Sequence, residues 1–115
     1  MIYHVISGGD PYAPASLAEE GFVHCSPDEA TTVAVVNAFY RDAGRPLRVL
    51  VLDEDRLTSR VEWEAADPAP PPGVSGDVSF PHVYGPLDRQ AVVRVLEVVW
   101  DGEGRATGLR EPAGD

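Results

Sequence analysis

Three short runs of apolar, mostly β-branched residues decide which folds are open to this chain. They are IYHVI at residues 2–6, LRVLVLD at 47–53 and AVVRVLEVVW at 91–100. Runs of this length and composition are typical of buried strands. Shorter segments add further extended chain: FVHCS at 22–26, RVEW at 60–63 and FPHVYGPL at 80–87. The sequence therefore predicts five or six strands.

One long segment, SPDEATTVAVVNAFYRDAG at residues 26–44, has the signals of a helix. Ser26 is placed as an N-cap, Pro27 as the first helical residue, and Glu29 as the acid of a capping box. Apolar residues then recur at helical spacing as far as Gly44. We therefore expect the main helix of the protein in this segment.

A second, shorter helix is predicted at residues 16–21, SLAEEG. Ser16 and Glu19 are spaced as a capping box, and Gly21 is a helix stop. With five or six strands, one main helix and one short helix, the predicted fold class is α+β. Residues 1–100 are expected to form a single domain, and the Gly-rich and charged residues 101–115 a flexible C-terminal tail.

The segment ADPAPPPGVSGD, residues 66–77, is predicted to be a long loop because its prolines cannot donate to a strand ladder. Loops of this length are often lids or binding loops, and disordered insertions are as common.

The net charge of −10, from 19 acidic and 9 basic residues, makes nucleic acid an unlikely partner. A small anionic ligand stays possible, because backbone N–H groups can bind phosphate locally. The sequence shows no signal peptide and no apolar stretch long enough for a membrane span. The single cysteine excludes an internal disulfide and fits a cytoplasmic location.

All three histidines, His4, His24 and His82, lie inside apolar segments. Three buried imidazoles would need up to six hydrogen-bond partners, which favours a shared polar pocket over three separate core positions. Because side chains alternate along a strand, His24 and Ser26 should share one face, while Cys25 points to the other. Cys25 is therefore expected to pack as a small apolar residue and not to act as a nucleophile.

Two further interpretations concern the polar groups around these histidines. As the helix N-cap, Ser26 would place free backbone N–H groups beside His24, a suitable position for a phosphate or carboxylate. The three histidines are also the ligand type of a catalytic zinc site, although their spacing gives no support for one. Glu62 and Glu64 flank Trp63 and share a strand face, where a carboxylate could orient a hydroxyl or stabilise positive charge; a solvated face is the simpler explanation.

Five segments in order, IYHV, SLAEEGFVHCS, LRVLVLD, VEWE and FPHVYGPL, closely resemble the small bacterial family known as domain of unknown function 952 (DUF952). The resemblance spans nearly all of residues 1–100, and GFVHCS with FPHVYGPL is its most specific part. That family is in turn similar to the ADP-ribosyltransferase superfamily, nearest to the RNA 2′-phosphotransferase branch. The resemblance implies a small split β-sheet that clasps NAD.

The resemblance also implies roles for individual residues. Tyr3 and His4 would hold the adenosine-side ribose of NAD, and His24 with Ser26 would line the same cleft. The remaining implied site residues are His82, Tyr84 as the ring that stacks on nicotinamide, and Glu64 as the first candidate for the catalytic glutamate, with Glu62 second. Members of the superfamily commonly have Gly and Thr where this chain has Val5 and Ile6.

The function implied by the resemblance is an NAD-dependent ADP-ribosyl transferase, or a related NAD-consuming enzyme, with NAD as substrate and a small molecule or protein as acceptor. Two alternatives remain at this point. One is a binding module that recognises NAD or ADP-ribose without turnover, which the replacement of Gly and Thr by Val5 and Ile6 favours. The other is a zinc hydrolase that uses the three histidines.

Overall fold

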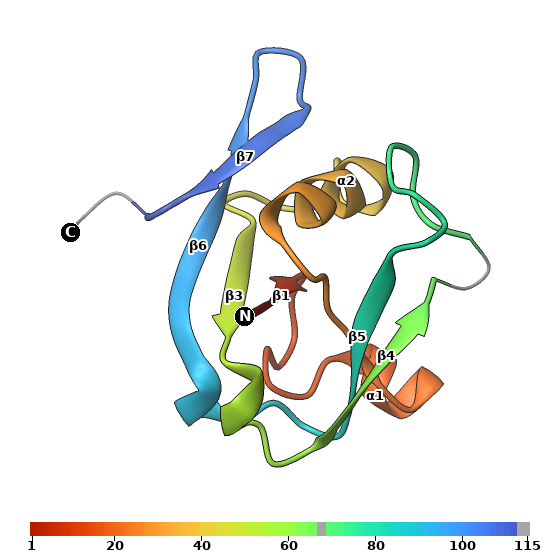
Figure 1. Ribbon diagram of the computed structural model, residues 1–115. Helices are drawn as coiled ribbons and strands as arrows, with labels where there is room; N and C mark the ends of the chain where they lie inside the picture. The colour runs from red at the N-terminus through yellow and green to blue at the C-terminus, as the bar shows by residue number, and fades with distance from the viewer. Residues whose placement is uncertain (67–68, 113–115) are drawn as a thin grey trace.

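The computed structural model describes residues 1–66 and 69–112 of the chain (Figure 1). Within these residues two α-helices, two short 3-10 helices and seven strands are formed. The helices are α1 (Ala15–Glu20) and α2 (Glu29–Phe39), with 3-10 turns η1 (Glu54–Arg56) and η2 (Arg89–Ala91). The strands are β1 (Ile2–Ile6), β2 (Val23–His24), β3 (Arg48–Leu52), β4 (Arg60–Ala65), β5 (Ser79–Tyr84), β6 (Val92–Trp100) and β7 (Ala106–Arg110).

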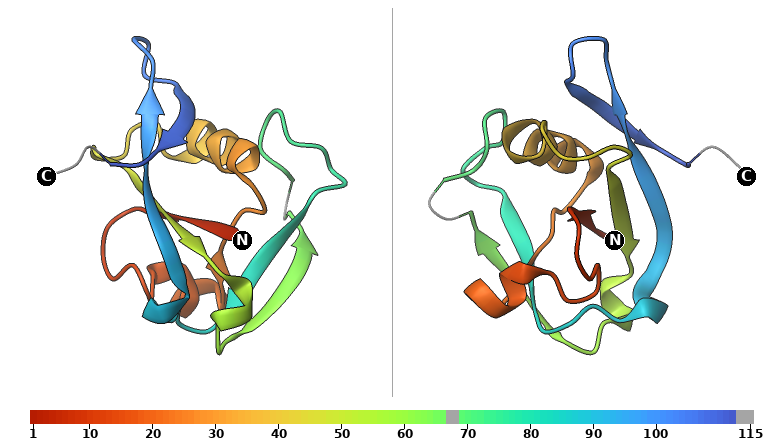
Figure 2. Two further views of the ribbon diagram at one scale, coloured as in Figure 1. Left: turned by 60° about the vertical axis from the view of Figure 1, so that its left-hand side comes forward. Right: turned by 180° about the vertical axis from the view of Figure 1, so that it is seen from behind.

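The strands of the described residues form two antiparallel sheets, a four-stranded one in the order β1-β3-β6-β7 and a three-stranded one in the order β2-β5-β4. One isolated bridge connects them: the backbone N–H of Tyr3 donates to the carbonyl of Ser26 at 2.9 Å, and the N–H of Ser26 donates back at 2.7 Å. Figure 2 shows the two sheets spreading apart from this junction beneath α2. The predicted α+β class, with one longer and one short helix, is confirmed.

Alternation along β1 divides its side chains between two apolar clusters. Ile2 lies in a cluster between the two sheets, whereas Val5 lies in a cluster between the four-stranded sheet and α2. The first cluster also holds Val23, Cys25, Leu50, Leu52, Val83, Leu87 and Ala91, and the second Val36, Leu47, Val49, Val98 and Ala106. Both faces of β3 are therefore covered, which explains its continuous run of apolar residues.

Both helices begin at other residues than the sequence predicted. Ser26 is not the N-cap of α2, because the helix begins at Glu29, and the backbone of Ser26 pairs with Tyr3 instead. Asp28 caps the helix instead: its Oδ1 accepts the N–H of Thr31 at 2.8 Å. In α1 the N-cap is Pro14, and no side chain caps the helix, so the capping box expected at Ser16 is also wrong. The stop at Gly21 is as predicted, with a left-handed φ of 89°.

The prediction of a flexible tail is wrong for residues 106–110, which form β7 and pair with β6. The turn between these strands extends above α2 in Figure 1. Asn37 of α2 fastens β7, since its side-chain amide donates to the carbonyl of Ala106 at 3.0 Å and accepts the N–H of Ala106 at 2.8 Å. Such long-range contacts could not be read from composition. The end of the expected tail, residues 113–115, lies outside the described residues.

Neither helix in the described ranges is long and apolar enough to cross a membrane.

Candidate functional site

A cleft of about 730 Å³ lies where β1, β2 and β5 meet the two helices. A volume of roughly 300–1,000 Å³ is typical of sites for small molecules and cofactors. Its lining includes Tyr3, His4, Ser26, Phe22, His24, Glu20, Phe39, Tyr40, Phe80, His82 and, from the proline-rich loop, Ala66, Ala69 and Pro71. The expected loop at 66–77 thus borders the cleft, although residues 67–68 lie outside the described ones.

The structure joins three of the predicted site residues through one carboxylate oxygen. Nδ1 of His82 lies 2.6 Å from Oε1 of Glu64, and the hydroxyl of Tyr84 donates to the same oxygen, also at 2.6 Å. Period-two alternation places His82 and Tyr84 on one face of β5, next to Glu64 on β4. Since Nδ1 of His82 faces the carboxylate as a donor, Nε2 is the ring nitrogen left to accept a proton.

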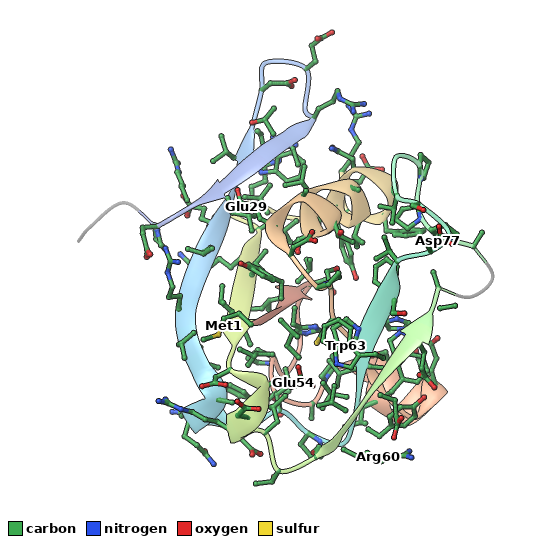
Figure 3. The ribbon with its side chains drawn as sticks, in the orientation of Figure 1. Met1, Glu29, Glu54, Arg60, Trp63 and Asp77 are labelled. Atoms are coloured by element: carbon green, nitrogen blue, oxygen red, sulfur yellow. The ribbon has the colours of Figure 1, made fainter. Side chains whose placement is uncertain are left out.

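The second glutamate of this strand, Glu62, has a different partner. Its carboxylate lies 3.4 Å from Nη1 of Arg60, at the surface. Trp63, between the two glutamates, points to the other face of β4 and donates its indole N–H to Glu54 at 3.0 Å (labelled in Figure 3). Of the two candidate carboxylates, Glu64 is therefore the one that contacts the histidine cluster.

Hydrogen bonding within the cluster shifts two acid–base equilibria in opposite directions. The bond from Tyr84, followed by the bond from His82, lowers the pKa of Glu64 below its ordinary value. The same bond to Glu64 raises the pKa of Tyr84. The cluster therefore holds a charged carboxylate next to a protonated phenol at neutral pH. The guanidinium of Arg60 lies over the Tyr84 ring, 4.4 Å from its centroid.

The expectation that all three histidines are buried is wrong for His24. Its side chain is 52% exposed, and its Nε2 lies 3.0 Å from Oε2 of Glu20, one helical turn earlier at the end of α1. The strand β2 ends at His24, at the edge of the three-stranded sheet. His24 nevertheless borders the cleft, with its ring centroid 5.6 Å from that of His82.

His4 is buried and held by the backbone of the neighbouring sheet. Its Nδ1 lies 2.9 Å from the carbonyl oxygen of His24, which makes Nδ1 the protonated nitrogen. Burial lowers the pKa of His4, so the ring is neutral at physiological pH. Tyr3 points to the opposite face of β1, where it packs against the cluster beneath α2, and it also borders the cleft.

Ser26 and Cys25 follow His24 on opposite faces. Ser26 is 4% exposed and borders the cleft beside the bridge to Tyr3. Cys25 is 3% exposed within the cluster between the sheets, and burial strongly raises the pKa of its thiol. The prediction that Cys25 packs as an apolar residue is confirmed.

The start of α2 is not the anion site that the sequence predicted. Asp28 already binds the N–H of Thr31, and Glu29 adds a second carboxylate in the first turn. Figure 3 shows Glu29 at this end of the helix, and its Oε2 accepts the N–H of Leu109 in β7 at 3.3 Å. Two carboxylates at the helix start would repel a phosphate.

Among the described residues, no group of three His, Cys, Asp or Glu side chains is arranged to hold a metal ion. The histidine rings have other partners: Nδ1 of His4 binds a carbonyl, and Nε2 of His24 and Nδ1 of His82 each face a glutamate. The three histidines of the described chain are therefore not arranged as a set of zinc ligands.

Phe22 lies at the centre of the site and is not among the site residues that the sequence predicted. Its ring stacks on His82 with centroids 4.3 Å apart, and lies 4.7 Å from His24 and 5.4 Å from Tyr84. The signal was available, because extending the alternation of His24 and Ser26 by two residues leads to Phe22. Phe39, at the mouth of the cleft, gave no such signal, since its position depends on how α2 packs on the sheets.

These features define a small α+β protein in which two antiparallel sheets and two helices border a histidine-lined cleft. The chain belongs to the family described as protein of unknown function (DUF952), whose model matches residues 4–95. The fold is similar to the crystal structure of protein CC0527 from Caulobacter crescentus, with a TM-score of 0.70, 23% sequence identity and coverage of 92% of each chain. A double mutant of CC0527 gives the same TM-score at 22% identity and the same coverage. No curated protein matches the sequence.

Proposed function

We propose that this protein is an NAD-dependent ADP-ribosyl transferase, or a related NAD-consuming enzyme, that acts on a small-molecule or protein acceptor. The observation that carries the proposal is the position of His82 on the cleft wall, with Glu64 and Tyr84 fixing its orientation through one oxygen. An imidazole oriented by a carboxylate through Nδ1 is a suitable general base at Nε2. The resemblance of the sequence to ADP-ribosyltransferases supplies the substrate.

In this reaction the bond between nicotinamide and the ribose C1′ breaks, and its electron pair leaves with nicotinamide. The ribose then carries an oxocarbenium-like positive charge, which the negative charge of Glu64 stabilises through the hydrogen-bonded cluster. The acceptor forms a new bond to C1′ and gives its proton to Nε2 of His82. His24, half exposed at the mouth, can pass that proton to solvent.

We propose a different role for Tyr84 from the one that the resemblance implies. The hydroxyl of Tyr84 is held by Glu64, and its ring is covered by Arg60, so we assign Tyr84 to positioning the carboxylate. Phe22, which borders the cleft, is the better ring to stack on nicotinamide. Tyr3, His4 and Ser26 keep the proposed role of contacting the ribose groups of NAD.

A second candidate is a module that binds NAD or ADP-ribose without turnover. The observation that favours it is the composition of the lining, which within the described residues includes no arginine to bind the pyrophosphate. The pyrophosphate would then be held by backbone N–H groups or would face solvent. Release of nicotinamide distinguishes the two candidates.

The first experiment measures the melting temperature with increasing NAD, for the wild-type protein and for His4→Ala. NAD at 100 times its Kd should stabilise the protein by roughly 2.7 kcal/mol, or about 10 °C for a chain of this size. The absence of any shift in the wild-type protein would overturn both candidates. A shift that is lost in His4→Ala would indicate binding in the cleft.

The second experiment measures nicotinamide release by two matched variants. Glu64→Gln removes the charged partner of His82 and Tyr84, and should lower the turnover rate by about 100-fold while NAD still binds. Glu62→Gln makes the same chemical change two residues away, where the partner is Arg60, and should leave turnover unchanged. NAD binding without release in the wild-type protein would favour the binding module.

A further inference from the structure

Among the described residues, the side chains that border the cleft include one carboxylate and no permanently charged cation. Within the described residues the lining includes no arginine, and the sequence contains no lysine. The acid in this lining is Glu20, at the end of α1, with a side chain 51% exposed beside His24. Glu64 lies behind His82, and the whole chain carries a net charge of −10. The local and the overall potential therefore both favour a cation.

The other notable component of the lining is aromatic. Phe22, Phe39, Tyr3, Tyr40 and Phe80 border the cleft. Phe39 is 70% exposed, so a large apolar ring stands uncovered at the mouth. Aromatic faces attract organic cations, and a carboxylate beside such faces adds to this attraction. Rings and a carboxylate without a competing arginine are the composition of a site for an organic cation.

We propose that the cleft binds a small organic cation, namely a primary amine in its protonated form, and that this amine is the acceptor; only the second part rests on the proposed function. The ammonium group lies at Glu20, and the apolar part of the molecule contacts the ring of Phe39. To act as the acceptor, the ammonium group first gives one proton to Nε2 of His82. The lone pair of the neutral amine then forms the bond to C1′ as the bond to nicotinamide breaks, so nicotinamide leaves neutral and the product is a protonated secondary amine.

The experiment uses three probes of similar shape and different charge: phenethylamine, 2-phenylethanol and 3-phenylpropionate. Their affinities for the full chain are measured by NMR titration at low salt and without NAD. The amine should bind about tenfold more tightly than the alcohol, and the carboxylate most weakly. Replacement of Phe39 by Leu, which keeps an apolar side chain but removes the ring, should weaken amine binding about threefold.

Two neighbouring glutamates on α1 provide a matched control. Glu20→Gln should weaken amine binding about fivefold and leave alcohol binding unchanged. Glu19→Gln changes the net charge equally but lies outside the lining, on the exposed side of the helix, and should leave both affinities unchanged. Raising the salt concentration should reduce the difference between the wild-type protein and Glu20→Gln.

Several outcomes would overturn the inference: carboxylate binding as tight as amine binding, equal losses in the two Gln variants, or no binding of any probe. NAD binding without amine binding overturns the inference and leaves the proposed function intact. Amine binding without NAD binding overturns the proposed function and shows the cleft to be a cation site with another role.

Discussion

The strand β3, one of two central strands in the four-stranded sheet, and β4, at an edge of the three-stranded sheet, differ in what surrounds them. In β3, residues 49–52 are all buried, because one face packs beneath α2 and the other against the second sheet. In β4, no residue is buried, and Glu62 and Glu64 lie on one half-solvated face. A strand with two covered faces can contribute only packing, whereas a half-solvated strand can hold a charged carboxylate next to a histidine at little cost in desolvation.

This difference separates the residues that stabilise the protein from those to which we assign the proposed chemistry. Changes beneath α2 should lower the free energy of unfolding strongly and leave the cleft chemistry of the remaining folded molecules intact. Changes on the face of β4 should have the opposite pattern. Each prediction below tests one side of this separation.

The largest loss of stability is expected from Leu47→Ala. Leu47 is 2% exposed in the cluster of Val36, Val49 and Val98, so its truncation leaves a cavity that the surrounding residues fill only in part. The free energy of unfolding should fall by about 3 kcal/mol. Urea denaturation measures this loss, with Val95→Ala as the control because Val95 is 38% exposed. Equal losses in the two variants would contradict the assignment of the core.

A smaller loss is expected from Asn37→Ala, which removes both hydrogen bonds between α2 and Ala106. The loss should be about 1–2 kcal/mol, since it leaves backbone groups of β7 without partners. Amide hydrogen exchange should show faster opening of β7 than of β3 in the variant. Thr107→Ala is the control, because its hydroxyl makes only a 3.4 Å contact with the carbonyl of Val99. Unchanged exchange in β7 would show that the hairpin does not depend on Asn37.

The same contrast explains how far the sequence predicted the fold. The α+β class and the strands β1, β3 and β6 follow from local apolar runs, which need no knowledge of partners. The strand β7 is hydrogen-bonded to Asn37, 69 residues away, and the segment before α2 pairs with β1 through the bridge between Tyr3 and Ser26. Contacts of this kind leave no local pattern, so both predictions failed at these places.

The candidate site was predictable to the extent that it lies on strands. Alternation placed His82 with Tyr84, and His24 with Ser26, and the same rule leads to Phe22. The choice of Glu64 over Glu62 as partner of His82 was not available from alternation, because both glutamates lie on the same face of β4. The strand register does not decide it either, because Glu62 is paired with His82 and Glu64 with Phe80. The conformation of the Glu64 side chain, whose Oε1 reaches both His82 and Tyr84, makes Glu64 the partner, and only the structure gives it.

The next prediction concerns the buried residue His4 and the pH dependence of the free energy of unfolding. Burial lowers the pKa of His4 in the folded state below its ordinary value of 6.5, so below that value the unfolded chain binds a proton that the folded protein does not. The free energy of unfolding should therefore fall as the pH drops below 6.5 and level off below the lowered folded-state pKa. His4→Asn should have a flatter dependence in urea denaturation over this window. An identical slope in the variant would show that another group causes the pH dependence.

The smallest effect on stability is expected from Glu64→Gln. Glu64 lies on the half-solvated face of β4, and its side chain is 42% exposed. Hydrogen bonds from Tyr84 and His82 lower its folded-state pKa below the ordinary value of 4.5. The resulting stabilisation is fully present above pH 4.5 and is lost as the pH falls through the lowered folded-state pKa. The difference in unfolding free energy between the wild-type protein and Glu64→Gln should therefore shrink on acidification. Glu62→Gln, with its surface contact to Arg60, should show a weaker trend. If the two variants have the same pH dependence, the hydrogen-bonded cluster around Glu64 contributes nothing that a surface ion pair does not, and its role in orienting His82 would have to be abandoned.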